Sequence, residues 1–172
     1  MQVQFTAYSG DCRVTGTLEL VGDRLTDMLN GDVPLVVGDA TLEAHEDGRR
    51  VNVPSLELDR ADLYAVEATG PRGSHGRRIH TVRHRILVEA GPYAVLGHLH
   101  ANPGAAPLRS IARRGLMVPL SDATIGYLRN DELFLEDIGT LLVNRRLARW
   151  VTEAAEGSAF QEGGMPRADV PA

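Results

Sequence analysis

Hydrophobic and polar residues alternate along two pairs of adjacent segments, and this alternation predicts two β-hairpins. In residues 82–90, for example, Ile86 and Val88 fall on one face while Arg85 and Glu89 fall on the other. A period of two is typical of a strand that buries one face. We expect the hairpin turns at residues 9–11 and 90–92, where Ser-Gly-Asp and Ala-Gly-Pro interrupt the alternation.

A different period follows each hairpin and predicts one short helix in each place. Apolar side chains there lie three and four residues apart, which places them on one helical face. A glycine follows each run and supplies the stop. The predicted helices are residues 24–30, with Leu25, Met28 and Leu29 as the buried stripe, and residues 107–114, with Leu108, Ile111 and Ala112.

The two hairpin and helix segments align with each other, which predicts an internal repeat. The strongest match pairs Val-Gly-Asp-Ala-Thr-Leu at residues 37–42 with Leu-Ser-Asp-Ala-Thr-Ile at residues 120–125. We call residues 2–68 the first unit and residues 82–152 the second unit, each a hairpin, a helix and two or three further strands. The expected fold class is mainly β with short helices (α+β), the two units forming a barrel or sandwich about a pseudo-twofold axis.

Two segments fall outside this repeat. Residues 69–81 form a glycine-rich basic linker, and residues 153–172 lack periodicity and carry glycine and proline. We therefore expect one duplicated domain over residues 1–152, followed by a disordered tail.

A family resemblance rests on the first unit. Arg-Leu-Thr-Asp-Met-Leu-Asn at residues 24–30, followed by Gly38-Asp39-Ala40, resembles small bacterial domains of unknown function that carry an Arg-Leu-x-Asp-x-Leu-Asn helix and a Ser/Thr-Asp-Ala turn. The second unit keeps the turn but has Arg109 and Arg113 in place of Asp27 and Asn30. This resemblance implies no activity. The element order also resembles duplicated cradle-loop barrels, which bears on fold alone.

Composition limits the classes of function. With 43% hydrophobic and 24% charged residues, the 172-residue chain is typical of a globular protein. No apolar run approaches the roughly 20 residues of a membrane span, and the first residues lack a signal-peptide pattern. We therefore expect a cytoplasmic protein without membrane insertion. Cys12 is the only cysteine, so this chain alone forms neither a disulfide nor a thiolate metal cluster.

Charge separates the two units more clearly than any motif. Residues 1–70 carry thirteen acidic residues against five arginines, whereas residues 71–152 carry six against twelve. Such a contrast directs association with partners of opposite charge. The residues expected to bind a partner are Arg72, Arg77, Arg78, Arg83, Arg85, Arg113 and Arg114.

Two further pairs are candidates for chemistry. His98 and His100 fall on one face of a strand, as a metal site requires, but a solvated sheet face explains them more simply. Asp39 and Asp122 occupy aligned positions and resemble a carboxylate dyad, although a local role in turns is favoured. We therefore expect no catalytic residues, no metal and no cofactor.

Three functions from different classes remain. The favoured one is a non-catalytic assembly or adaptor module that contacts a protein partner or further copies of itself. The second is nucleic-acid binding through the arginine-rich half, which an aromatic content of 5% disfavours for single strands. The third is a metal-binding protein or enzyme that uses His98 and His100.

Overall fold

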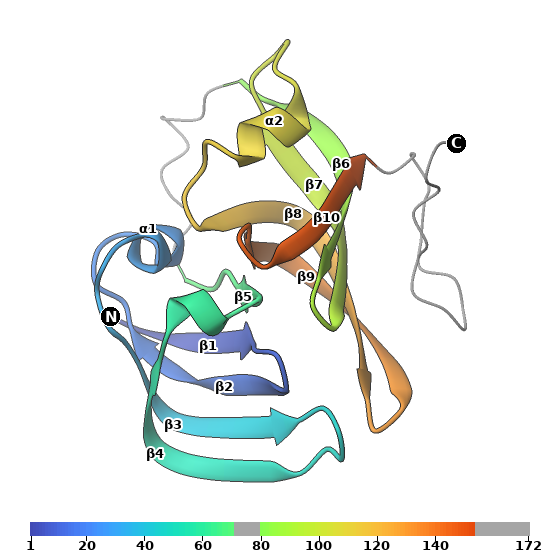
Figure 1. The fold of residues 1–172 in the computed structure, drawn as a ribbon. Coiled ribbons are helices and arrows are strands. Elements are labelled where there is room, and N and C mark those ends of the chain that lie inside the picture. The colour runs from blue at the N-terminus through green and yellow to red at the C-terminus, as the bar shows by residue number, and fades with distance from the viewer. Residues whose placement is uncertain (71–79, 154–172) are drawn as a thin grey trace.

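The computed structural model describes residues 1–70 and 80–153, which form ten strands and two short α-helices (Figure 1). The predicted hairpins and the mainly β character are confirmed. The elements are β1 (Gln2–Tyr8), β2 (Cys12–Glu19), α1 (Leu25–Asn30), β3 (Leu35–Ala44), β4 (Arg50–Leu58), a 3-10 turn η1 (Arg60–Asp62), β5 (Ala65–Glu67), β6 (Val82–Ala90), β7 (Tyr93–Ala101), α2 (Pro107–Ile111), β8 (Met117–Arg129), β9 (Glu132–Asn144) and β10 (Ala148–Glu153).

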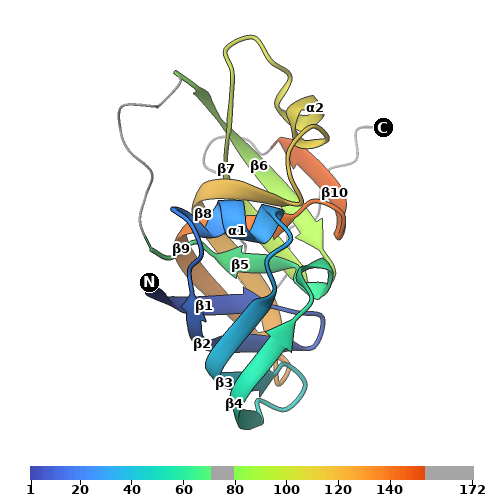
Figure 2. The same ribbon diagram turned by 90° about the vertical axis from the view of Figure 1, so that its left-hand side faces the viewer.

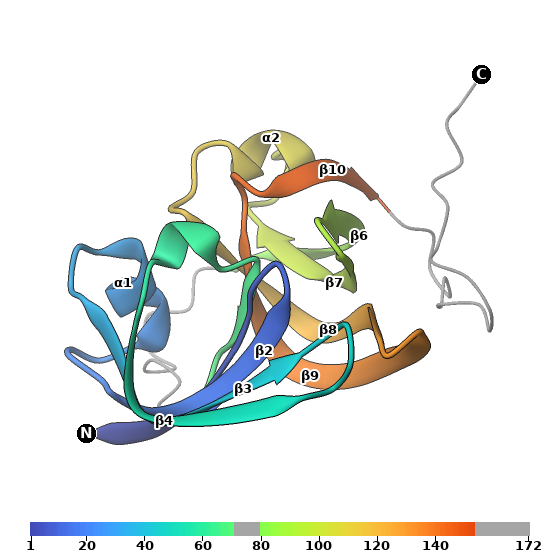
Figure 3. The same ribbon diagram turned by 60° about the horizontal axis from the view of Figure 1, so that its bottom comes forward.

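All ten strands belong to one antiparallel sheet that is not closed. Their order is β10-β6-β7-β8-β9-β5-β1-β2-β3-β4, so β10 and β4 are its two ends among the described residues. The predicted barrel or sandwich is therefore not confirmed. Figure 3 shows the sheet curling beneath both helices.

The strand order within each unit is the same, and the two units meet at unlike edges. The first unit runs β5-β1-β2-β3-β4 and the second runs β10-β6-β7-β8-β9. The seam joins β9 to β5, where Val66 pairs with Leu142. A twofold axis brings identical edges together. In sheet order, however, this seam joins the final strand of the second unit, β9, to the initial strand of the first unit, β5. The predicted pseudo-twofold pairing is not confirmed.

The prediction that Asp39 and Asp122 lie in turns is wrong, because both lie inside long strands, β3 and β8. Their φ angles are 48° and 46°, in the left-handed region that Asp tolerates better than most residues. One such residue shifts the alternation of faces along the strand. Consequently two core residues in each strand are three apart instead of two, namely Val37 with Ala40 and Leu120 with Ala123.

The neighbouring strands accommodate this shift with bulges at aligned positions. The register changes between Thr15 and Thr17 of β2 and between Leu96 and His98 of β7. Gly16 lies at the first bulge, where a Cβ would stand 2.6 Å from the Val37 side chain. Only glycine fits this close approach.

Each unit has its own hydrophobic core, and each core includes residues of the other unit. Met117 and Leu142 of the second unit pack into the first core, while Tyr8 and Ala65 of the first unit pack into the second core. The Asn30 side chain pairs with both backbone groups of Met117, at 2.8 and 3.2 Å, and so fixes α1 against β8 (Figure 2). The two units therefore fold against each other.

The two helices cover their cores unequally. The predicted apolar stripe of α1 is buried, which confirms that prediction. The stripe predicted for the second helix is wrong: Leu108 is 38% exposed, Ala112 is exposed, and α2 ends at Ile111. Only Pro107 of α2 is buried, and Ile111 is partly buried against the second core. Neither helix of the described residues is long and apolar enough to cross a membrane.

Candidate functional site

Several of the sequence-predicted site residues lie on the outer face of β6, β7 and β8, opposite the second core. Arg83 contacts Asp122 at 2.5 Å, and the same nitrogen lies 3.1 Å from His98 Nδ1. His100 Nε2 lies 2.8 Å from the Ser121 hydroxyl. The structure thus gathers Arg83, His98, His100 and Asp122 around one patch of the sheet.

Burial and positive neighbours together set the protonation state of His100. Burial is the larger cause that lowers its pKa, and the charges of Arg83, His98 and Arg114 act in the same direction. A neutral imidazole beside a serine hydroxyl is the pairing that a general base requires. However, Thr81 occupies the other ring nitrogen, at 3.2 Å, in place of a carboxylate that would stabilise an imidazolium.

The two histidines do not converge on one point. His98 turns to Arg83, and His100 turns to Ser121 and Thr81. Over residues 1–70 and 80–153, no three His, Cys, Asp or Glu side chains are grouped as metal ligands. The arrangement therefore gives the predicted pair no third ligand there.

The arginines predicted to bind a partner fall into three groups. Arg72, Arg77 and Arg78 lie outside the described residues. Internal contacts occupy Arg83, which pairs with Asp122, and Arg114, which donates to the His100 carbonyl. Arg85 is half-buried and Arg113 is exposed.

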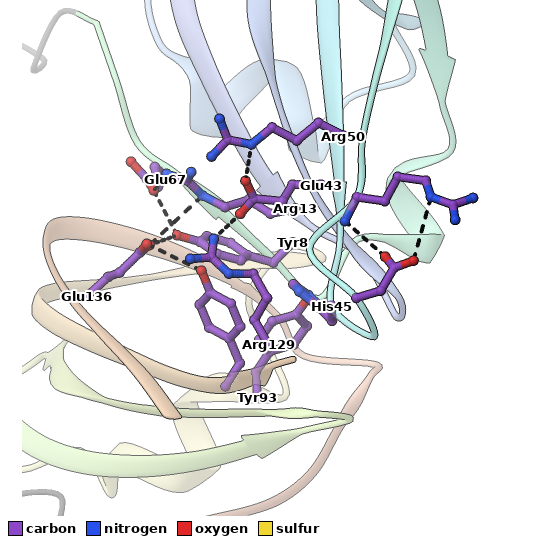
Figure 4. Close-up of polar contacts among 12 residues, drawn as sticks. Tyr8, Arg13, Glu43, His45, Arg50, Glu67, Tyr93, Arg129 and Glu136 are labelled. Atoms are coloured by element: carbon purple, nitrogen blue, oxygen red, sulfur yellow. Dashed lines mark hydrogen bonds and ion pairs between the residues drawn. The ribbon is translucent and has the colours of Figure 1, made fainter. Parts of the chain in front are cut away.

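A second polar cluster, which the sequence did not predict, lies where the β8–β9 hairpin covers the end of the first unit (Figure 4). We call it the junction cluster: Tyr8, Arg13, Glu43, His45, Glu67, Tyr93, Tyr127, Arg129 and Glu136. Tyr8 is central because its hydroxyl lies 2.7 Å from Glu136 and 2.8 Å from Glu67. Burial and these carboxylates raise the pKa of Tyr8. Arg13 lies 3.9 and 4.0 Å from the same two carboxylates and offsets part of their negative charge.

His45 and Tyr93 extend this cluster toward the first hairpin turn. The Tyr93 hydroxyl donates its single proton to the Ser9 carbonyl. His45 Nε2, 2.5 Å away, must therefore be the donor to Tyr93. Its Nδ1 is buried without a hydrogen-bond partner, and burial lowers the pKa of His45. Both observations indicate a neutral imidazole.

Glu43 completes the cluster with ion pairs to both units. It is 7% exposed, contacts Arg50 at 2.5 Å and pairs with Arg129 of the second unit. Burial alone would raise its pKa, but the hydrogen bonds from both arginines keep the pKa below the usual value. The acidic first unit and the basic second unit thus meet through a buried carboxylate.

The junction cluster joins the two units. Aromatic rings fill its centre, with Tyr8 and Tyr127 edge to face at 5.8 Å. Its residues come from β1, β2, β3, β5, β7, β8, β9 and the β3–β4 turn, so no local sequence motif predicts it. The one usable signal is Tyr8, an aromatic residue on the otherwise polar face of β1.

Two leucine side chains are exposed on the outer face of the second unit. Leu128 of β8 is 53% exposed and Leu135 of β9 is 47% exposed. Their neighbours Tyr127 and Phe134 face the core, so alternation places both leucines on the outer face. In the first unit, Val51 of β4 is 51% exposed.

A small apolar pocket lies beneath α2. Its walls are apolar side chains of β6, β8 and β9 together with Ile111 and Ala148, and Arg145 stands at its edge. Arg145 donates to the carbonyls of Arg114 and Gly115. The pocket exists because α2 covers its sheet incompletely.

No protein-family model matches the sequence, and no curated protein or solved structure shows significant similarity to it.

Proposed function

We propose that this protein is a non-catalytic assembly module that acts through protein–protein contacts, first of all between copies of itself. The observation that carries the proposal is the open sheet. Over residues 1–70 and 80–153, its two end strands, β4 and β10, have no further neighbouring strand, and native sheets usually cover or blunt such edges. Val51 is 51% exposed on the end strand β4, and Leu128 and Leu135 are exposed on β8 and β9.

We also infer that the two units arose by duplication. Support comes from their common strand order, from the bulges at aligned places, and from Asp39 and Asp122 in the same left-handed conformation. Asp59 and Asn144 add to it, since each accepts from the backbone N–H two residues later, at 2.8 and 3.0 Å.

Charge complements this picture by orienting copies toward each other. The first unit is acidic and the second basic, so unlike ends attract. Exposed ion pairs give only about 0 to 1 kcal/mol each, so apolar and backbone contacts hold the complex.

Sedimentation of the full chain at low and high salt, with and without a mixed-sequence DNA duplex, tests the proposal. We expect particles larger than the monomer. Their size should grow with protein concentration, fall as salt is added and stay the same when the DNA is added. A monomer at every concentration overturns the proposal. A size change only when DNA is added favours the nucleic-acid alternative.

A second candidate, hydrolytic chemistry at Ser121, is favoured by its 2.8 Å contact with His100. It ranks lower because the surrounding Arg83 and Asp122 side chains are 51% and 65% exposed, and water screens a charge that develops there. Covalent labelling by a fluorophosphonate, lost in Ser121→Ala and His100→Gln, would support it. Equal labelling of the wild type and both variants would remove it.

A further inference from the structure

We propose that copies join head to tail, with the β4 edge of one copy adding to the β10 edge of the next. This inference rests on the proposed self-association and names the surfaces that carry it. The partner is a second copy of this chain, and the contact repeats the seam between β9 and β5 within each copy.

The strand order is the first step of the argument. Because the units have the same internal order, β4 corresponds to β9 and β10 corresponds to β5. The chain already joins a β9 edge to a β5 edge. A contact between unlike edges always leaves the complementary pair unused, here β4 and β10, and such contacts propagate into rings or filaments.

The paired segment of β4 supports the same contact. The seam uses three residues of β9, Leu141, Leu142 and Val143. In the aligned segment of β4, Leu56 and Leu58 pack against the first core while the edge itself has no neighbouring strand among the described residues. Leu56-Glu57-Leu58 therefore provides a rigid template of the same length.

The outer faces provide the side-chain contacts. Within a copy, the β8–β9 hairpin covers Arg13, Glu43 and His45 of the first unit, and Asn130 donates to the His45 carbonyl at 2.8 Å. The aligned residues of the second unit are Ala94 and Gly126, which are already buried, and Leu128, which is 53% exposed. By the same geometry, the tip of the β3–β4 hairpin of the next copy covers Leu128.

The β3–β4 hairpin carries an exposed apolar residue of its own. Glu136, which bonds Tyr8 and pairs with Arg13 in the junction cluster, aligns with Val51 of β4, which is 51% exposed. By this alignment, Val51 of one copy lies near Ala94 and Glu89 of the next, the residues that align with Arg13 and Tyr8. Backbone pairing of the two edges and burial of Leu128 supply affinity, and the charge contrast sets the direction.

Single variants at the two surfaces test the inference. Val51→Asp damages only the β4 side, and Leu128→Asp damages only the second-unit side. Each should weaken self-association by about tenfold or more, because a carboxylate loses water on burial in an apolar contact. Val21→Asp is the matched control, since Val21 is equally exposed at 56% but lies in the loop before α1. It should assemble as the wild type does, and thermal melting checks that all three fold.

Mixing the two variants gives the decisive result. A Val51→Asp copy keeps an intact second-unit side, and a Leu128→Asp copy keeps an intact β4 side. Sedimentation of the equimolar mixture should therefore show a species that stops at the heterodimer, formed by neither variant alone. Wild-type self-association without this complementation overturns the head-to-tail contact and leaves self-association standing. A wild type that stays monomeric overturns the proposed function itself.

Discussion

The first unit packs its helix closely on its sheet and carries the junction cluster on its outer face, whereas the second unit packs its helix loosely and exposes Leu128 on its outer face. Below the first helix, Leu25, Met28 and Leu29 are buried, while α2 buries only Pro107 and leaves a pocket. On the outer side, the junction cluster covers the first unit, while Leu128 is exposed on the second.

This difference shows that the same strand order does not ensure the same packing. The outer face of the first unit carries charge because partner charges from the β8–β9 hairpin are always present beside it. A buried charge without such a partner costs several kcal/mol. In the second unit, the aligned residues Ala94, Gly126 and Leu128 hold no charge to be compensated.

The largest effect that distinguishes the two units is expected at the helices. Leu25→Ala should lower the free energy of unfolding by about 2–5 kcal/mol, since it removes a buried side chain and leaves a cavity. Leu25 is 3% exposed, and the aligned Leu108 is 38% exposed. Leu108→Ala should change the stability by about 0.5 kcal/mol or less. Urea unfolding of both variants measures the contrast, and equal losses would contradict it.

The junction cluster gives the next largest effect. Tyr8→Phe should cost about 1–3 kcal/mol, because the change leaves Glu67 and Glu136 without their shared donor. Tyr127→Phe serves as a control, since it removes only one contact of 3.3 Å, and it should cost less. A smaller loss for Tyr8→Phe than for Tyr127→Phe in urea unfolding would show that Arg13 alone holds the two carboxylates.

Local pattern predicted the hairpins and α1 because both depend on the period of apolar residues. It failed at Asp39 and Asp122, where Asp before a small residue is typical of turns. Here the left-handed conformation and a bulge in the next strand let each strand continue. Such a shift requires matching changes in two neighbouring strands. The sequence of one strand alone does not show whether its neighbour carries the matching bulge.

The long-range features were beyond local pattern for the same reason. The seam between β9 and β5 joins segments far apart in the chain and decides between an open sheet and a barrel. The charge contrast was visible in the sequence. The sequence did not predict that Arg83 pairs with Asp122 across β7 or that Arg129 pairs with Glu43. The candidate histidines were correctly placed on one face, while their partners came from β6 and β8.

Acid should weaken both units through one histidine in each. Burial lowers the pKa of His45 and of His100 in the folded protein, so the unfolded chain binds a proton first as pH falls. Stability is therefore present above about pH 6.5, the ordinary histidine value, and is lost as the pH drops toward the folded pKa. Each histidine changes the free energy of unfolding by at most about 1.4 kcal/mol per pH unit.

His45→Gln and His100→Gln separate these contributions. Each variant should flatten the fall in unfolding free energy between about pH 6.5 and 5, measured by urea titration at each pH. A slope that persists in both test variants would assign the acid sensitivity to other groups.

The smallest expected effect is a gain in the second unit. Ala148 lines the pocket beneath α2, and the aligned residue of the first unit is Leu63, which is buried. Ala148→Val should add apolar contact with Ile111 without crowding the strands, and should raise the unfolding free energy by about 0.5–1 kcal/mol. Ala105→Val adds the same methyl groups at an exposed loop position and should be neutral. If Ala148→Val were destabilising, the pocket would already be closed by movement of α2, and the looser packing of the second unit would not hold in solution.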